Sequence, residues 1–145
     1  MSEQRQAAAQ VRAELGGVDY VVELQAGRHR FLADEPAGLG GTDAGPGPFP
    51  LLLSGLAACT AITLRMYAKR KGWNLTNVHV DTRLAPRQAG AQQAGLHIDR
   101  SISLQGELDA SQRARLLDVS ERTPVTLALK GGMQIHTTLA GPEIA

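Results

Sequence analysis

The sequence has little cysteine, few aromatic residues and almost no excess charge. Cys59 is the single cysteine among 145 residues, so an internal disulfide, and with it a disulfide-stabilised scaffold, is excluded. Aromatic residues make up only 3% of the chain and no long basic run accompanies them, which counts against modules that stack nucleic-acid bases. The formal net charge of +1 gives no strong field toward nucleic acid or an anionic membrane. We therefore expect neither as a partner.

The length and apolar content predict one folded domain over residues 1–145. Hydrophobic residues make up 43% of the chain, which is enough for a core of mainly aliphatic side chains at about residues 18–139. Residues 1–12 are polar and charged, so we expect them to be poorly ordered and see no signal peptide there. The longest apolar stretch, 51–64, is shorter than the roughly 20 residues of a membrane span. Together with the single thiol, this predicts a cytoplasmic protein.

The first third of the chain predicts a β-hairpin followed by a long loop. Residues 18–24 and 29–33 are rich in strand-forming residues and are separated by a turn. Residues 9–15 fit either a further strand or a short helix. Five glycines and three prolines predict a loop over residues 34–48, which is either a functional loop or a plain surface connection.

A long helix is predicted to follow this loop and run to about residue 71. Pro50 suits its first turn, and Gly72 suits its end. Residues 51–64 are apolar nearly all round, which implies burial on several sides of the helix. Residues 65–71 are mostly charged, and their basic side chains are favourable at a helix C-terminus.

The remaining chain predicts a second hairpin, two short helices and a last strand. Residues 77–84 and 96–104 alternate between apolar and polar side chains, which is typical of strands with one wet face, and a polar loop at 86–95 joins them.

The end of that hairpin is followed by helix signals. Asp109 and Gln112 form the pattern of a helix N-cap, and Pro124 begins a second short helix. Residues 133–139 are predicted to form a strand. The order of elements predicts an α+β fold with mostly antiparallel strands.

Cys59 lies inside the predicted long helix, and the residues alone allow two interpretations. Free cysteines are commonly buried and inert, so Cys59 is either a small packed side chain or a reactive thiol. The helix dipole does little to stabilise a thiolate at Cys59, because Cys59 is far from the N-terminus of the helix. An activated thiol here would need a nearby cation.

A set of local motifs spans roughly residues 18–139. The motifs lie at residues 29, 33–36, 40–46, 48–68, 71–75, 98–108, 112–117 and 124–125. The most specific is the segment 48–59, which reads PFPLLLSGLAAC. In this order the motifs resemble the family of osmotically induced protein C and organic hydroperoxide resistance protein (OsmC/Ohr).

The resemblance implies a fold and a mechanism. The implied fold is an intertwined homodimer in which curved, mainly antiparallel sheets wrap around long central helices, with active sites at the dimer interface. Cys59 takes the position of the peroxidatic thiol, which reduces an organic hydroperoxide and becomes a sulfenic acid. In active members a second cysteine forms a disulfide with it, an external dithiol reduces that disulfide, and no cofactor takes part.

Three features depart from the family pattern, and one of them is the lack of the further cysteines that close relatives often carry in the loop at residues 87–95. Thr123 stands where the family carries its resolving cysteine, and threonine cannot form a disulfide. Phe49 and Pro50 stand where family members usually carry a carboxylate at the start of the long helix. Glu35, close to the start of the glycine-rich loop, could replace that carboxylate or could be an ordinary surface acid.

The activating arginine of the family comes from the N-terminal hairpin. Arg28 and Arg30 are the candidates in this chain, and simple solvent exposure is the alternative for both. The four histidines show no metal-ligand spacing, so we expect no metal site.

Two functions of different classes follow from these observations. The first is a stress-response enzyme, a one-cysteine hydroperoxide reductase whose Cys59 sulfenic acid is resolved by an external thiol. The alternative is a catalytically degenerate, non-enzymatic module that keeps the dimeric fold and binds a small apolar ligand.

Overall fold

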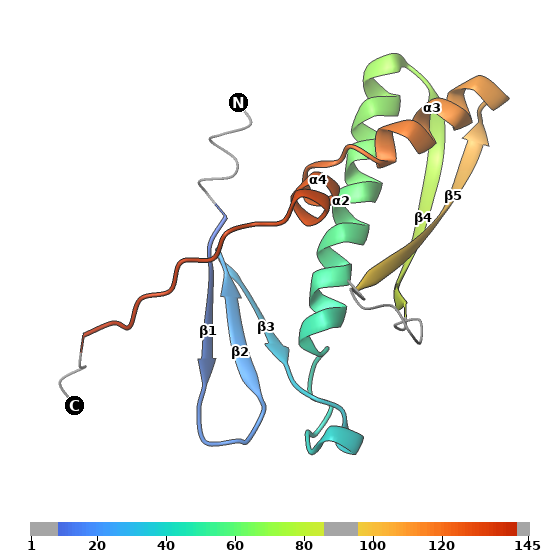
Figure 1. Ribbon diagram of the computed structural model, residues 1–145. Helices are drawn as coiled ribbons and strands as arrows, with labels where there is room; N and C mark the ends of the chain where they lie inside the picture. The colour runs from blue at the N-terminus through green and yellow to red at the C-terminus, as the bar shows by residue number, and fades with distance from the viewer. Residues whose placement is uncertain (1–8, 86–95, 142–145) are drawn as a thin grey trace, which may run out of the picture. The chain divides into compact units, whose positions relative to one another are not determined.

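The computed structural model describes residues 9–85 and 96–141 (Figure 1). The chain packs as two compact units, Met1–Ser54 and Gly55–Ala145. One helix, α2 (Pro48–Lys71), begins in the first unit and continues into the second. The sheets of both units are antiparallel, which confirms the predicted α+β class, whereas the single-domain boundary stays a prediction.

The first unit contains a three-stranded sheet in the order β1–β2–β3. Its strands are β1 (Val11–Leu15), β2 (Val22–Ala26) and β3 (His29–Ala33). The predicted hairpin is therefore confirmed, and its tight turn contains Gly27 with a φ of 61°. The first strand of the hairpin begins at Val22 rather than residue 18, because a turn closed from Val21 N–H to the Val18 carbonyl precedes it.

The open choice at residues 9–15 is settled in favour of a strand, since β1 pairs along its whole length with β2. Residues 11 and 12 therefore belong to a paired strand, which corrects the expectation that residues 1–12 are poorly ordered. Residues 1–8 and the predicted loop at 86–95 lie outside the described residues.

The glycine-rich segment is a loop, as predicted, with one 3₁₀ turn, η1 (Ala37–Leu39). Helix α2 begins at Pro48, two residues earlier than predicted, and ends at Lys71, after which Gly72 has a φ of 70°. Basic residues occupy its last turn, where they complement the helix dipole.

Burial of α2 is narrower than its composition predicts. The buried side chains recur every fourth residue and are Leu56, Thr60, Leu64 and Ala68. Other apolar side chains of α2 are exposed, Ile62 by 56% and Met66 by 53%, so the expected burial on several sides is wrong for this chain alone. By length and composition alone, α2 is long and apolar enough to cross a membrane. The prediction from the sequence rested only on residues 51–64, which are too few for a span.

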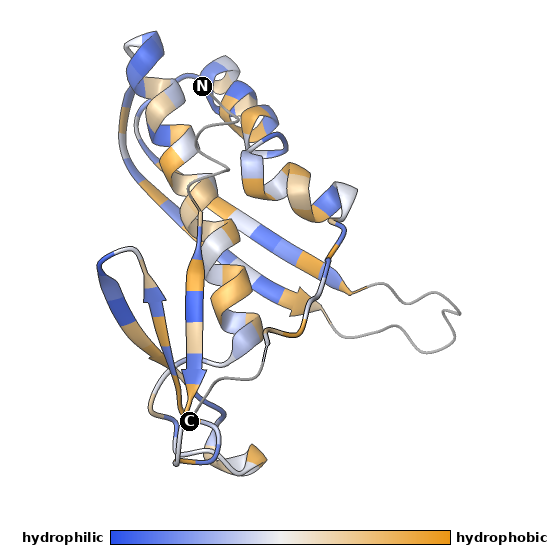
Figure 2. Cartoon of the chain, turned by 90° about the vertical axis from the view of Figure 1, so that its left-hand side faces the viewer, coloured by the Kyte–Doolittle hydropathy of each residue, from blue (hydrophilic) through white to orange (hydrophobic). Residues whose placement is uncertain are grey.

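The second unit contains a two-stranded sheet that covers the Gly55–Lys71 part of α2. Its strands are β4 (Asn74–Ala85) and β5 (His97–Glu107), and their alternating hydropathy is visible in Figure 2. Their apolar faces pack with α2 and α3 (Ala110–Ser120) around a core. The buried residues of this core are Leu64, Ala68, Leu75, Leu116 and Val119. Gly106, with a φ of 132°, lies where a Cβ atom would come within 1.9 Å of the Asn74 carbonyl oxygen.

Both predicted C-terminal helices are present. Asp109 and Gln112 form a complete capping box at the start of α3, as their spacing predicts. Thr123 is the N-cap of α4 (Pro124–Gly131), and Pro124 is its first residue.

The predicted strand at residues 133–139 is wrong for the described chain. These residues form no regular element, and the side chains of Ile135 and Leu139 are 87% and 99% exposed. An alternating sequence needs a neighbouring strand before it becomes a strand, and none of the described residues pairs with this segment.

Candidate thiol site

Cys59 lies on α2 beside the buried stripe of the helix, not in its centre. Its neighbour Thr60 is fully buried, whereas Cys59 is half-buried. Its sulfur lies 4.0 Å from the Thr63 hydroxyl, one turn further along the same helix face. The thiol is therefore partly accessible in the single chain, as a reactive thiol must be.

Thr123, predicted from the sequence to stand where the family carries its resolving cysteine, is fully buried and caps a helix. Its hydroxyl accepts a hydrogen bond from the Thr126 backbone N–H, which caps α4. The same hydroxyl lies 2.7 Å from the Thr126 hydroxyl. Thr123 is thus engaged in the start of α4, and its side chain cannot form a disulfide.

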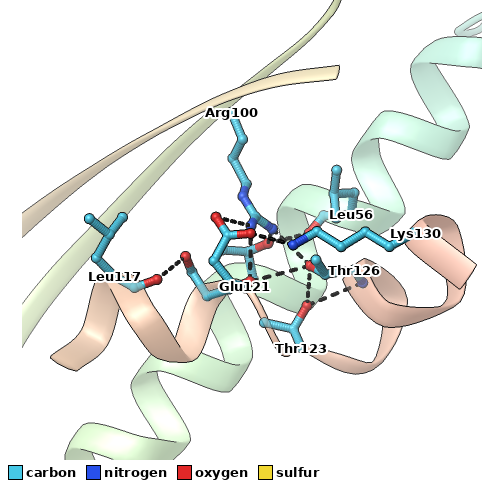
Figure 3. A network of polar contacts seen from close by, with 9 residues as sticks. Leu56, Arg100, Leu117, Glu121, Thr123, Thr126 and Lys130 are labelled. Carbon is cyan, nitrogen blue, oxygen red and sulfur yellow. Dashed lines mark hydrogen bonds and ion pairs between the residues drawn. The ribbon is translucent and has the colours of Figure 1, made fainter. Parts of the chain in front are cut away.

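A buried arginine of β5 connects this cap with the helix that carries Cys59. The Arg100 side chain is only 10% exposed. Its Nη1 donates to the hydroxyls of Thr60 at 2.9 Å and Thr126 at 2.8 Å, and its Nη2 donates to the Ser120 carbonyl at 2.9 Å (Figure 3). One guanidinium thereby joins α2, the end of α3 and the start of α4.

Glu121 balances the charge of this network. Its carboxylate lies 3.7 Å from Arg100 Nη2 and accepts a hydrogen bond from Lys130 (Figure 3). The hydrogen bond from Lys130 holds the pKa of the Glu121 carboxyl below its usual value, and the nearby charges of Lys130 and Arg100 act in the same direction. The buried guanidinium therefore has a partner that stays ionised at neutral pH.

Sequence reasoning missed Arg100, although the sequence held a signal for it. Ile98, Arg100 and Ile102 occupy alternate positions of β5, so the arginine stands in the inward-facing series of the strand. A charge at an inward position must be hydrogen-bonded or paired to be tolerated. That requirement could have marked Arg100 as an organising residue.

The candidate cations Arg28 and Arg30 lie in the first unit, whereas Cys59 and Thr123 lie in the second. Arg28 is exposed in the β2–β3 turn. Arg30, on β3, lies 3.6 Å from the Glu23 carboxylate, and both side chains are more than half exposed. A pair this exposed contributes little to stability, so Arg30 is not locked in place by it.

The candidate carboxylate Glu35 follows a second residue that the sequence interpretation missed, Asp34. Asp34 is 2% exposed and accepts four hydrogen bonds, from the Thr42 hydroxyl and from the backbone N–H groups of Glu35, Thr42 and Ala44. The hydrogen bond from the Thr42 hydroxyl, with the backbone donors, lowers the pKa of Asp34 to about 2. Asp34 thus folds the glycine-rich loop around one carboxylate and fixes the backbone at Glu35.

Two glycines allow the loop to close this tightly. A Cβ atom on Gly41 would lie 1.8 Å from the Glu35 carbonyl oxygen, and one on Gly45 would lie 2.1 Å from the Leu32 carbonyl oxygen. Only glycine permits such backbone approach. The abundance of glycine in this loop therefore has a packing reason.

The first turn of α2 carries no acidic side chain, in line with Phe49 and Pro50 in the sequence. Across residues 9–85 and 96–141, no group of three or more histidine, cysteine, aspartate or glutamate side chains is placed to hold a metal ion. The site therefore consists of the half-buried Cys59, the capping threonine Thr123 and the largely buried Arg100 network.

Comparison with protein families finds a match to the model of OsmC-like protein over residues 41–138. A search of curated protein sequences finds no significant match.

Solved structures share the fold. An OsmC-like protein from Mycoplasma pneumoniae superposes with a TM-score of 0.71 at 22% identity, covering 85% of this chain and 87% of its own. An organic hydroperoxide resistance protein OsmC from Legionella pneumophila gives a TM-score of 0.60 at 22% identity, covering 85% and 89%. The organic hydroperoxide resistance protein OhrB of Bacillus subtilis superposes with a TM-score of 0.57 at 22% identity, covering 85% of this chain and 90% of its own.

Proposed function

Because the chain belongs to the OsmC-like protein family, we propose that it reduces organic hydroperoxides with Cys59 as the attacking thiol. The observation that carries the proposal is the position of a single, half-buried cysteine on α2, within the matched residues. The names of similar structures, organic hydroperoxide resistance proteins among them, indicate the substrate class.

The proposed reaction begins at the thiolate of Cys59. The sulfur attacks one oxygen of the hydroperoxide, the O–O bond breaks, and the alcohol leaves after taking a proton. The sulfur is oxidised to a sulfenic acid while the peroxide is reduced, which is the first step of cysteine oxidation.

The second half of the cycle must use a thiol from outside the chain. Cys59 is the single cysteine, and Thr123 is buried in the cap of α4. An external thiol attacks the sulfenic acid, releases water and forms a mixed disulfide, and a second thiol then restores Cys59. A reducing cytoplasm supplies such thiols, which agrees with the predicted location.

We assign the homodimer of the family to this chain through the exposed face of α2. Gly55, Cys59, Ile62 and Met66 follow a spacing of four, three and four residues, so they lie on one face of the helix. Apart from the helix's own backbone and the adjacent residues, no atom of the described residues lies within 4 Å of where a Gly55 Cβ would be, and Ile62 and Met66 are more than half exposed. A second copy would cover this stripe and enclose Cys59 in an apolar setting for an organic hydroperoxide.

Arg28 and Arg30 remain the candidates for the cation that activates Cys59, and Glu35 for the carboxylate that orients it. Their support is their place in the N-terminal hairpin and in the loop that Asp34 fixes. Replacement of each arginine by methionine, one at a time, identifies the activating residue as the one whose loss slows Cys59 oxidation.

Steady-state reduction of cumene hydroperoxide with dithiothreitol as reductant tests the proposed function. The wild-type chain should consume peroxide at a rate above the uncatalysed reaction, and Cys59→Ser should lose that activity while keeping its fold. Equal activity of both proteins would refute the role of Cys59. No activity in either would favour the alternative, a non-enzymatic module that binds a small apolar ligand.

A further inference from the structure

A pocket of about 530 Å³ lies beside Arg100, entirely within the second unit. Its volume falls within the roughly 300–1,000 Å³ of small-molecule sites. The apolar part of its lining comes from α2, β5, α4 and the residue before β5, and consists of Leu56, Leu96, Ile98 and Leu129. The pocket shares Arg100, Glu121 and Thr126 with the polar network described above, but Cys59 is not among its lining residues.

The charges that line the pocket are already matched by other groups of the chain. Glu121 pairs with both Arg100 and Lys130 (Figure 3), and Asp99 pairs with Arg83 at 2.9 Å. Among the described lining residues, an ionised ligand head would find no unpaired counter-ion and would lose its hydration without compensation. The pocket therefore favours an uncharged head.

The donors of Arg100 define which uncharged head fits. Arginine donates hydrogen bonds and accepts none. Its Nη1 donates to Thr60 and Thr126, and its Nη2 donates to Ser120 and faces the Glu121 carboxylate at 3.7 Å. Its Nε–H has no hydrogen-bond acceptor among the described residues. No fully buried side-chain polar atom of the described residues lacks a partner, so this Nε–H is open to solvent or to a ligand.

From these observations we propose that the pocket binds a small neutral amphiphile, an apolar chain that carries an uncharged oxygen acceptor such as a ketone, ester or alcohol. The ligand oxygen accepts a hydrogen bond from the Arg100 Nε–H, and the apolar chain of the ligand lies along Leu56, Ile98 and Leu129. Binding does not require Cys59, so this proposal and the proposed peroxidase activity succeed or fail independently.

The test is a titration of the isotope-labelled full chain, followed by amide chemical shifts, with three probes of equal chain length. The neutral probe 2-octanone should shift the amides of Ile98, Arg100 and Leu129 in a saturable way. Octanoate and octylammonium should bind at least tenfold more weakly, because the pocket has no free counter-ion for either. Octanoate or octylammonium binding as tightly as 2-octanone would overturn the assigned ligand class.

Variants locate the binding. Leu129→Trp should fill the pocket and abolish the saturable shifts, whereas Leu127→Trp, on the same helix but 53% exposed and outside the lining, should leave them unchanged. Cys59→Ser should bind 2-octanone like the wild type. An absence of saturable shifts in the wild-type chain, which needs no variant to fold, would overturn the proposal, as would binding that survives in folded Leu129→Trp.

Discussion

Asp34 and Arg100 are charged side chains that the chain buries and surrounds with hydrogen bonds. Each organises one unit: Asp34 holds the loop that leads to α2, and Arg100 joins α2 with α3 and α4. A buried charge without such partners would be strongly destabilising, so the dense bonding is a condition of the fold. Both residues act through hydrogen bonds to backbone groups and hydroxyls, which hydropathy patterns do not reveal.

Replacement of Asp34 by asparagine should lower the melting temperature at neutral pH, because an amide brings N–H donors toward the donors that the carboxylate now accepts from. The folded pKa of about 2 lies below the ordinary value of 3.8. The stabilisation is therefore complete above the ordinary pKa and is lost as the pH falls toward 2.

Melting curves of wild-type protein and Asp34→Asn between pH 7 and pH 2 measure this effect. The difference in melting temperature between the two proteins should be largest above pH 4 and should decrease toward pH 2. Asp43→Asn is the matched control, since Asp43 is exposed and asparagine tolerates its φ of 56°. A difference in melting temperature that does not change with pH would contradict the role assigned to the Asp34 charge.

At the scale of elements, α4 depends on the cap that its first turn receives. Thr123→Ala removes the capping hydroxyl and leaves the buried Thr126 hydroxyl with one partner fewer. We expect a loss of about 1 kcal/mol in the free energy of unfolding, measured by urea denaturation. Thr123→Ser keeps the hydroxyl, so its free energy of unfolding should fall clearly less. An equal decrease in both variants would contradict the capping role.

Most elements of this chain were predictable because local signals agree with the fold. The β2–β3 hairpin, the β4–β5 strands and the capping box of α3 follow from short-range patterns that the structure confirms. The strand predicted at residues 133–139 was wrong because a strand needs an edge to pair with, and sequence alternation does not say whether one is present.

The candidate site was predictable in part. The position of Cys59 inside a long helix was predicted from the sequence and is confirmed, whereas the loss of a second cysteine at Thr123 stays a prediction. Arg100 and Asp34 were missed because their roles come from contacts 40 and up to 10 residues away along the chain, respectively. Such contacts form only when the backbone folds.

At the scale of the whole molecule, the proposed homodimer rests on the exposed apolar face of α2. Ile62→Glu places a charge in the stripe assigned to the second copy, so we expect a wild-type homodimer and a monomeric variant in sedimentation velocity. Leu117→Glu, at a side chain 59% exposed on α3, is the control and should stay dimeric. A wild-type chain that sediments as a monomer at micromolar concentrations would contradict the assignment.

The peroxidatic role of Cys59 is the central claim, and a single-turnover oxidation tests it most directly. Reduced protein is mixed with one equivalent of cumene hydroperoxide, and a sulfenic-acid trap is added before intact mass is measured. We predict rapid and stoichiometric trapping at Cys59, at a rate well above that of free cysteine under the same conditions. A thiol that stays reduced under a large excess of hydroperoxide would contradict the account.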